Sequence, residues 1–311
     1  MTEGQRYQIS ILTENGESQA SIARKLGKSK STICRELQRN RSIDGMYEPS
    51  TAQELMRARR AASSKYRISD STVLLVECLL RLDWSPEQVS SVASGIGHAV
   101  SHEWIYQFVA QDKMNGGKLY KHLRQGHKRY RKGKGTKRCV IPNPVSIDDR
   151  TAIVDTRERF GDWEIDTVLG KQGTGALVTI AERKTRFYLV KKVNAKSAEE
   201  VRKATIELLR PYANYVHTIT ADNGSEFVEH EAIAEALKAK VYFAHPYSSW
   251  ERGLNENSNG LLRQYIPKGV DLRLITDEDV DFAVKRINSR PRKCLGFRQP
   301  SVVFESLCQA A

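Results

Sequence analysis

The spacing of apolar residues changes once along the chain. Up to about residue 112, apolar positions recur every three or four residues, which is typical of amphipathic helices. From about residue 151, short runs rich in β-branched residues alternate with helical segments. The pattern therefore predicts an all-helical N-terminal part followed by an α/β part.

The first helical segments have the spacing of a helix-turn-helix. Residues 6–14 and 18–26 are each amphipathic, Gly27 ends the second, and a serine at position 29 or 31 can cap a third helix. The positions expected to be buried in the second and third helices are Ala20, Ile22, Ala23, Leu26, Ile33 and Leu37. The outward face of the third helix carries Lys30, Thr32, Arg35 and Arg39. The first three would enter a major groove; the alternative is an ordinary helical bundle with a basic face.

A second, weaker helix-turn-helix pattern follows. Ser85 and Gln88 form a capping box around Pro86 at the first helical position, so a helix start there is well specified. Ser101 caps another helix. Its expected buried positions are Trp104, Ile105, Phe108 and Val109. Scaffolding between two functional domains is the alternative role for this unit.

The α/β part predicts five strands in the order β-β-β-α-β-α-β-α. The expected strands are residues 162–168, 176–181, 187–193, 216–221 and 240–243, with a turn at 183–185 in the first hairpin. The expected helices are residues 197–209, opened by a capping box of Ser197 and Glu200, 229–238 and 253–263. Three meandering strands followed by alternating helix and strand describe a mixed sheet with helices on its faces, as in the ribonuclease H architecture.

The positive charge is concentrated in one stretch. The chain has a net charge of +13, and residues 113–138 hold eleven Lys or Arg and no Asp or Glu, so this stretch alone carries +11. Such a block needs an anionic partner. No amphipathic apolar stripe accompanies it, so nucleic acid fits better than a membrane surface. A solvated linker is the alternative.

The bulk composition, 40% hydrophobic and 28% charged, is that of a globular protein. No apolar run reaches the roughly 18–20 residues that span a bilayer, and the first residues lack a signal-peptide pattern, so a cytoplasmic protein is expected. The five cysteines are odd in number and show no C-x-x-C spacing. They therefore indicate neither a disulfide framework nor a zinc site.

Three acidic residues could form a metal site. Asp166 lies in the first predicted strand, Asp222 ends the fourth before Asn223-Gly224, and Glu256 lies in the middle of the last predicted helix. If the three converge, they can hold two divalent metal ions that activate a hydroxyl group and stabilise a leaving oxygen during phosphodiester cleavage.

Neighbouring acids compete for these positions. Strand alternation places Asp162 and Glu164 on the same face as Asp166, which is preferred because it lies deepest in the apolar run. The alternatives at the other two positions are a turn-capping role for Asp222, Glu226 as a ligand in its place, and Glu251 instead of Glu256.

The helix around Glu256 carries further candidates. Asn259 and Gly260 follow Glu256 by one turn and Arg263 by two, so the glycine could admit a DNA backbone and the arginine a phosphate. The residues expected to line the groove are Trp250, Arg252, Asn255 and Arg263. Packing and helix capping are the alternative roles for these four.

The motifs resemble those of the IS30 family of bacterial insertion-sequence transposases. The matching segments are residues 160–167 (FGDWEIDT), 220–227 (TADNGSEF), 245–253 (HPYSSWERG) with 255–257 (NEN), 265–269 (YIPKG) and 288–296 (NSRPRKCLG). The resemblance runs from about residue 5 to 306. That family has an Asp, Asp, Glu triad on a ribonuclease H-like core with 33 residues between the last two acids, the spacing of Asp222 and Glu256 here. Some members have Gly where Ile165 stands, and Ile165 is expected to point away from the metals.

The resemblance implies a DNA transposase. Its catalytic and metal-binding residues would be Asp166, Asp222 and Glu256, with two Mg²⁺ ions for which Mn²⁺ can substitute. It would bind the terminal inverted repeats of its element, cleave at the ends and join the 3′-hydroxyl to target DNA, as a homodimer or larger assembly. The residues expected to contact DNA are Lys30, Thr32, Arg35, Arg39, Lys128, Arg129, Arg131, Lys132, Arg252 and Arg263.

The expected organisation has four parts: a helix-turn-helix domain at residues 1–62, a second helical unit at 63–112, a basic linker at 113–150 and a ribonuclease H-like catalytic domain at 151–311 with a C-terminal helix. A transcription regulator would share the DNA-binding parts but would not need the three acids. A catalytically inactive transposase descendant would also bind DNA, but the intact acids argue against it. A phage- or retrovirus-like integrase would more typically carry a zinc-binding domain, which this cysteine pattern cannot build.

Overall fold

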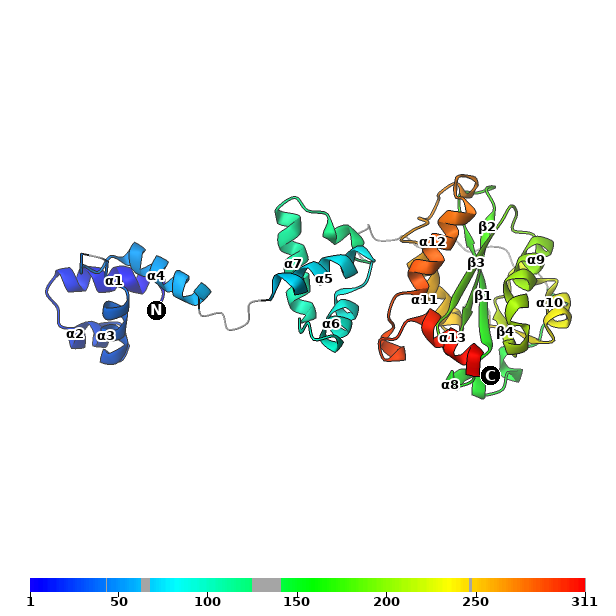
Figure 1. Cartoon of the computed structure of the whole chain (residues 1–311), viewed down its shortest axis with the longest axis horizontal. Helices are drawn as coiled ribbons and strands as arrows, with labels where there is room; N and C mark the ends of the chain where they lie inside the picture. The colour runs from blue at the N-terminus through cyan, green and yellow to red at the C-terminus, as the bar shows by residue number, and fades with distance from the viewer. Residues whose placement is uncertain (43, 63–67, 125–140, 246–247, 311) are drawn as a thin grey trace. The chain divides into compact units, whose positions relative to one another are not determined.

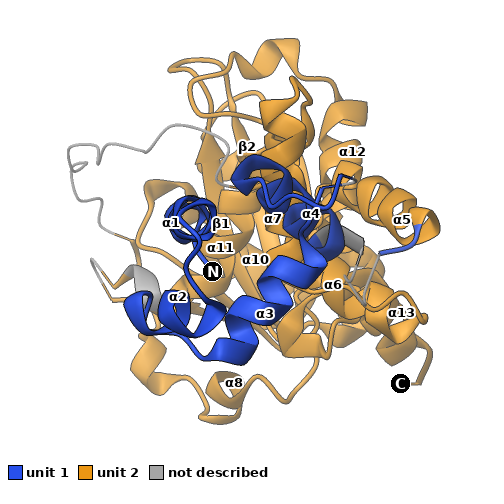
Figure 2. Ribbon diagram, turned by 90° about the vertical axis from the view of Figure 1, so that its left-hand side faces the viewer, with its two compact units in different colours: residues 1–69 blue, residues 70–311 orange. Residues whose placement is uncertain are grey.

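The computed structural model describes two compact units of the chain, Met1–Ser69 and Asp70–Ala311 (Figures 1 and 2). Within them, the described residues are 1–42, 44–62, 68–124, 141–245 and 248–310. Each unit is treated by itself below.

The first unit contains the predicted helix-turn-helix and one further helix. Its helices are α1 (Glu3–Glu14), α2 (Gln19–Lys25), α3 (Lys30–Arg39) and α4 (Pro49–Ala62). Gly27 turns the chain between α2 and α3 with a φ of +60°, a conformation that glycine adopts without strain. The core consists of Ile9, Ile22, Ala23, Ile33 and Leu37. The expected burial of Ala20 was wrong, because this residue lies on the opposite side of α2 from Ile22 and faces solvent.

The second unit begins with the second predicted helical segment. It comprises α5 (Asp70–Arg81), α6 (Pro86–Gly95), α7 (His102–Met114) and the short 3₁₀ helix η1 (Leu119–His122). The capping box of Ser85 and Gln88 and the cap at Ser101 form as expected. Of the four apolar positions expected to be buried in α7, Ile105 and Val109 are buried. Trp104 and Phe108 are half-buried instead, because they stack on each other with ring centroids 5.2 Å apart.

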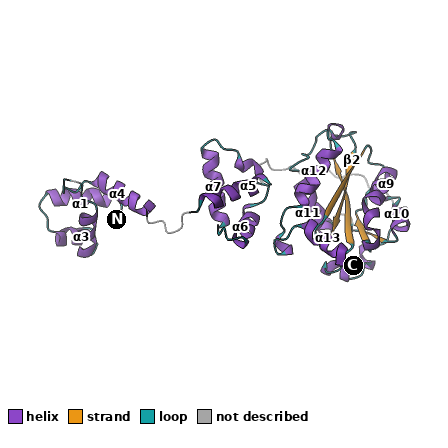
Figure 3. Ribbon diagram, viewed as in Figure 1, coloured by secondary structure: helices purple, strands orange, loops and turns teal. Residues whose placement is uncertain are grey.

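A five-stranded mixed sheet forms the centre of the rest of the second unit (Figure 3). The strands are β1 (Asp162–Leu169), β2 (Ala176–Glu182), β3 (Tyr188–Val193), β4 (Thr218–Ala221) and β5 (Lys240–Phe243). Their order is β3-β2-β1-β4-β5, with β1, β4 and β5 parallel and β2 antiparallel to both neighbours. This is the predicted ribonuclease H-like arrangement, and β1 lies at its centre.

Helices cover both faces of this sheet. One face packs against α9 (Ala198–Leu209), α10 (His230–Leu237) and Phe304 of α13 (Pro300–Ala310). The other packs against α11 (Gly253–Leu262) and α12 (Asp277–Asn288), as Figure 1 shows on either side of the sheet. Short helices in the connections are η2 (Ile147–Asp149), α8 (Ile153–Thr156), η3 (Arg210–Tyr215), η4 (Ser225–Phe227), η5 (Ser249–Arg252), η6 (Leu272–Leu274) and η7 (Lys293–Leu295).

Only half of the capping box expected at α9 forms. The Ser197 hydroxyl accepts a hydrogen bond from the Glu200 backbone at 3.3 Å, as predicted. The Glu200 carboxylate, however, accepts from the backbone N–H groups of Asn194 and Ala195 at 2.7 and 3.1 Å. It therefore fixes the loop between β3 and α9 and does not bind the N–H of Ser197.

The helices α5–α7 are joined to the sheet domain by polar contacts around Asp83. One carboxylate oxygen of Asp83 lies 2.7 Å from His122 Nδ1, and the other accepts a hydrogen bond from the Tyr265 hydroxyl at 2.9 Å. Gln88 Nε2 donates to the carbonyl of Pro291 at 2.6 Å. The contacts with Tyr265 and Pro291 hold the second helical segment against the α11–α12 side of the sheet domain, and the His122 contact lies within the segment itself.

Candidate active site

Two of the three acids on β1 have structural roles. Asp162 and Glu164 are completely buried. Asp162 accepts hydrogen bonds from the Arg159 guanidinium at 2.6 and 3.1 Å. Glu164 accepts one from Arg183 at 2.6 Å and one from the backbone N–H of Asn255 at 3.0 Å. Their oxygens are therefore engaged inside the fold, and Glu164 anchors the start of α11 to β1.

Asp166 is the β1 acid that reaches a partly exposed position. It is half-buried, so the reasoning that it lies deepest in the apolar run was wrong: β1 leaves the core at its C-terminal end, and Glu164 is the deepest acid. Its carboxylate accepts hydrogen bonds from the Thr167 backbone at 2.8 Å and from Asn259 Nδ2 at 2.9 Å. Ile165 points the other way, into the core, as expected.

The surroundings of Asp166 raise the pKa of its carboxyl group. Burial raises the pKa of the Asp166 carboxyl to about 6; the nearby Arg252 guanidinium opposes this, and the negative charge of Asp222 adds to it. The carboxylates of Asp166 and Asp222 therefore share the positive charge of one guanidinium group, that of Arg252. An additional cation at this position would relieve their repulsion.

Arg252 bridges the two aspartates. Its Nη2 lies 3.2 Å from Asp222 Oδ2, and its Nη1 lies 3.6 Å from Asp166 Oδ1. Nη1 also donates to the carbonyl of Ile165 at 3.4 Å. The Arg252 side chain is largely buried, and its Nε has no hydrogen-bond partner among the described residues. One cationic group thus links the C-terminal part of β1 to the turn after β4.

Asp222 combines the two roles that the sequence left open. It follows directly after β4, at the carboxyl edge of the sheet, as predicted. Its Oδ1 accepts a hydrogen bond from the Gly224 backbone at 3.0 Å, which is the turn-capping role. Its Oδ2 faces Arg252 instead. The turn therefore fixes the carboxylate without occupying both of its oxygens.

Glu256 lies on the face of α11 that borders Asp166. It follows Arg252 by four residues and precedes Asn259 by three, and both of these contact Asp166. It sits in the first turn of α11, whose start at Gly253 is the predicted one, so the description of Glu256 as lying in the middle of the helix was wrong. Its side chain is exposed, and no described residue forms a hydrogen bond or ion pair with it.

The side chains of the three acids do not form a complete metal-binding site in the structure. Among the described residues, no group of three Asp, Glu, His or Cys side chains is close enough together to hold a metal ion. The Arg252 guanidinium lies between Asp166 and Asp222, and Glu256 extends into solvent. The structure thus brings the two aspartates together through Arg252 and places Glu256 beside them on α11.

The competing acids are engaged elsewhere. Glu226 is buried. It accepts a hydrogen bond from the Thr167 hydroxyl at 2.7 Å and forms an ion pair with Lys196 at 2.8 Å, although its Oε2 has no partner among the described residues. Glu251 binds both the backbone and the ring of His245 at 2.8 Å. These contacts use Glu226 and Glu251 to fix loops beside the site.

Sequence reasoning gave Asn259 no role, and the structure gives it one. Its side chain donates to Asp166 and accepts from the Tyr188 hydroxyl at 2.6 Å, so it fixes the aspartate against β3. The i+3 spacing from Glu256 was the available signal. Arg263 donates to the carbonyl of Leu169 at 2.7 Å. It therefore joins the end of α11 to the end of β1.

Three of the four expected DNA-contacting residues of the first unit border one groove. Lys30, Arg35 and Arg39 are exposed on α3 and Thr32 is half-buried. A groove of about 700 Å³ borders Thr32, Arg35 and Arg39, and α4 adds two arginines that the sequence reasoning did not consider, Arg59 and Arg60. The candidates Lys128, Arg129, Arg131 and Lys132, and the side chain of Trp250, lie outside the described residues.

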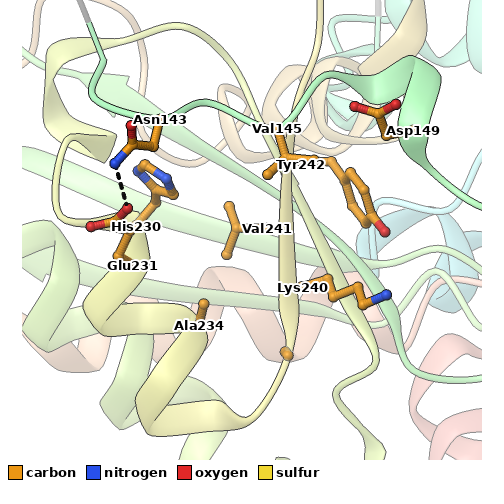
Figure 4. Close-up of a pocket in the computed structure, with 10 residues that line it drawn as sticks. Asn143, Val145, Asp149, His230, Glu231, Ala234, Lys240, Val241 and Tyr242 are labelled. Atoms are coloured by element: carbon orange, nitrogen blue, oxygen red, sulfur yellow. Dashed lines mark hydrogen bonds between the residues drawn. The ribbon is translucent and has the colours of Figure 1, made fainter.

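A separate pocket of about 470 Å³ lies at the outer edge of β5 (Figure 4). Val145 accepts a hydrogen bond from the backbone of Phe243, and Asn143 donates to Glu231 of α10 at 3.2 Å, so the segment before η2 forms one wall. None of the acids of the candidate active site lines this pocket. It is therefore a different feature from the site on β1, β4 and α11.

No helix in the part of the chain that the structure describes is long and apolar enough to cross a membrane. The four cysteines in that part are unpaired: Cys34, Cys78, Cys294 and Cys308.

A helix-turn-helix unit together with a ribonuclease H-like sheet that carries acids at the ends of β1 and β4 defines the class of DNA-recombining polynucleotidyl transferases. Comparisons agree with this class: residues 1–40 match the model of a helix-turn-helix domain and residues 157–249 that of an integrase core domain.

Three relatives place the chain more closely. It is 43% identical over 314 residues to the transposase for insertion sequence element IS4351 of Bacteroides fragilis, covering 99% of this chain and 96% of the relative. It is 35% identical to the transposase for IS1086 of Cupriavidus metallidurans (85% and 82% covered) and 32% identical to transposase InsI for IS30A of Escherichia coli K12 (73% and 62% covered). The chain belongs to the IS30 family of insertion-sequence transposases and is a DNA transposase.

Proposed function

We propose that this transposase cuts and joins DNA with Asp166, Asp222 and Glu256 as its catalytic, metal-binding residues. Its substrates would be the terminal inverted repeats of its own element and a target DNA. The observation that carries the proposal is the bridge of Arg252 to both aspartates, with Glu256 one turn further along the same helix. A third carboxylate in this place completes a set that can bind divalent cations.

The donor set fits magnesium chemically. Mg²⁺ prefers carboxylate and water oxygens, and Mn²⁺ accepts the same ligands. Asp166 and Asp222 already share a single cationic partner, and no described residue compensates Glu256. When bound, a pair of such ions would activate a water or a 3′-hydroxyl and stabilise the leaving oxygen.

The chain's own residues orient this set. Asn259 and the Thr167 backbone hold the Asp166 carboxylate, and the Gly224 backbone holds Asp222. Both carboxylates therefore keep a fixed geometry, in which Oδ2 of Asp222 and Oδ1 of Asp166 face Arg252. Arg252 and Arg263, on the same side, are the proposed contacts to the DNA backbone.

The chemistry can be tested by metal-dependent nicking. A supercoiled plasmid carrying the element's two ends should be nicked by the protein with Mg²⁺ or Mn²⁺ and left intact when EDTA is present. The competing function is a catalytically inactive regulator, which would bind the same plasmid without nicking it in either condition. Binding without any metal-dependent nicking would therefore contradict the proposed function.

Recognition of the element ends is assigned to α3 of the first unit. Replacing Arg35, which is exposed on this helix, with Ala should lower the ratio of specific to random DNA affinity by about tenfold, since a good base contact contributes roughly 1–3 kcal/mol. Fluorescence anisotropy with terminal-repeat and scrambled duplexes measures this ratio. Arg24→Ala, at an exposed arginine of α2, is the matched control and should leave the ratio unchanged. An unchanged ratio in Arg35→Ala would refute base reading by Arg35.

The remaining assignments follow from the substrate. The four basic candidates at positions 128–132 would bind phosphates without reading sequence. Two element ends must be brought together, so we propose a homodimer or larger assembly on DNA, with Mg²⁺ as the cofactor and a cytoplasmic, nucleoid-associated location. The four-part domain organisation given above is kept as a proposal.

A further inference from the structure

A second pocket lies within the helical segment that precedes the sheet domain. It has a volume of about 600 Å³ and is formed by the start of α6, by Tyr106 and Lys113 of α7, and by η1 with the two residues that follow it. Its chemically distinctive walls are Tyr106, Lys113, Tyr120 and Arg124. Nothing in the proposed cutting and joining steps uses these four residues.

The walls combine aromatic faces with positive charge. Lys113 Nζ lies 4.6 Å above the centre of the Tyr120 ring, and the Tyr106 side chain is 51% exposed. The carboxylate in the lining, Glu87, is ion-paired with Lys293 at 2.6 Å. The positive charges of Lys113 and Arg124 are thus not cancelled by this acid.

The pocket adjoins the helix that carries Glu256. Arg124 Nη2 donates to Asn257 Oδ1 at 3.1 Å, and Asn257 is the residue after Glu256. Gly260 lacks a side chain where Arg124 passes, since a Cβ there would lie 3.2 Å from Arg124 Nη2. The hydrogen bonds of Tyr265 to Asp83 and of Gln88 to Pro291 hold this helical segment against the sheet domain. The pocket therefore has a defined position beside α11.

Aromatic faces with flanking cations are typical of sites for unpaired nucleotides, where the base stacks and the cations bind phosphate. The volume suits one nucleotide or two, because small-ligand sites span about 300–1,000 Å³. A DNA duplex, whose major groove alone is roughly 12 Å wide, cannot enter a cavity of this size. The occupant that fits is an unpaired nucleotide of a DNA strand running past Glu256.

We propose that this pocket binds a single unpaired nucleotide, with its base against Tyr106 and Tyr120 and its phosphate against Lys113 and Arg124. The nucleotide comes from the DNA strand beside the cleavage position. The pocket thereby adds a contact to an opened DNA end that the helix-turn-helix does not make. This inference deepens the proposed function and rests on its placement of cleavage at Glu256.

The test compares two DNA probes and one free nucleotide with the full-length protein. Anisotropy should give about tenfold tighter binding to a duplex with a short single-stranded thymidine overhang than to the blunt duplex, the effect of stacking roughly one base. Tyr106→Ala should abolish this preference and Tyr106→Phe should keep it. Met114→Ala, at an exposed residue of α7 outside the pocket, is the matched control and should bind as the wild type does.

A photocrosslink locates the contact. An overhang with 5-iododeoxyuridine should crosslink to the peptide that contains Tyr106 or Tyr120. An overhang preference that survives in Tyr106→Ala would overturn the proposal. If excess dTMP displaces a bound nucleotide analogue but the protein shows no preference for the overhang duplex, the pocket binds a free nucleotide. That result would overturn the DNA strand as the source of the bound nucleotide. Because these are binding measurements, a failure of metal-dependent nicking with an intact overhang preference would contradict the catalytic assignment alone.

Discussion

Asp166→Asn is expected to abolish metal-dependent cleavage and joining while DNA binding remains intact. The amide keeps the size of the carboxylate and one of its two acceptor oxygens, but it removes the negative charge that a cation needs. Loss of a group that stabilises charge in the transition state reduces turnover by on the order of 10³-fold. Plasmid nicking in Mg²⁺ and anisotropy on terminal-repeat DNA measure the two properties separately.

The chain offers a matched acidic control for this change. Glu251 lies beside the site but is bound to His245, so Glu251→Gln should leave most of the nicking activity. Glu256→Gln should behave like Asp166→Asn if the exposed acid of α11 is the third ligand. Nicking at the wild-type rate by Asp166→Asn would rule out the assignment of this residue.

Arg252→Ala is expected to increase the affinity of the site for Mn²⁺ and to lower the stability of the protein in EDTA. The guanidinium contacts the oxygens of Asp166 and Asp222 that would hold a cation, so the two positive groups compete. Removing the arginine should tighten Mn²⁺ binding by about tenfold, which corresponds to roughly 1.4 kcal/mol of charge interaction. Without it, the two carboxylates repel each other, so the melting temperature in EDTA should fall.

Isothermal titration with Mn²⁺ and thermal melts with and without EDTA provide both readouts. Arg263→Ala is the matched control, because Arg263 lies on the same helix but binds the carbonyl of Leu169 and no carboxylate of the site. It should leave Mn²⁺ affinity unchanged. Weaker Mn²⁺ binding in Arg252→Ala would show that the arginine supports the cation and does not compete with it.

The sequence predicted the sheet domain well because its signals are local. Each of the five expected strands exists within two residues of its predicted bounds, and β1, β4 and α11 carry the three acids. Strand alternation grouped Asp162, Glu164 and Asp166 on one face. Alternation alone cannot say which of these carboxylates is available to bind a metal ion. That depends on Arg159 and Arg183, and the Glu164–Arg183 pair joins residues 19 positions apart.

Two helices of the structure, α4 and α5, were not expected, although both have helical spacing of apolar residues.

Contacts between distant segments could not be predicted from the sequence pattern. The role of Arg252 as a bridge depends on the fold bringing the start of α11 to β1 and the β4 turn. The docking of Asp83 on Tyr265 joins residues 182 positions apart. Such pairs leave no periodic signal, since each depends on two surfaces that meet only after the domain has folded.

Amide substitutions at the acids of β1 would inactivate the protein in two different ways, by destabilising the fold or by removing a catalytic group. An amide substitution at Glu164 would leave the buried Arg183 without its nearest counter-charge, at a cost of about 3–5 kcal/mol for a buried pair. The same substitution at Asp166 would leave a folded protein. In a genetic screen for elements that no longer transpose, inactive alleles at codons 164 and 166 would therefore differ. Alleles at codon 164 would be recessive, because they yield little protein. Alleles at codon 166 would be dominant, because they yield a stable protein that can occupy the element ends.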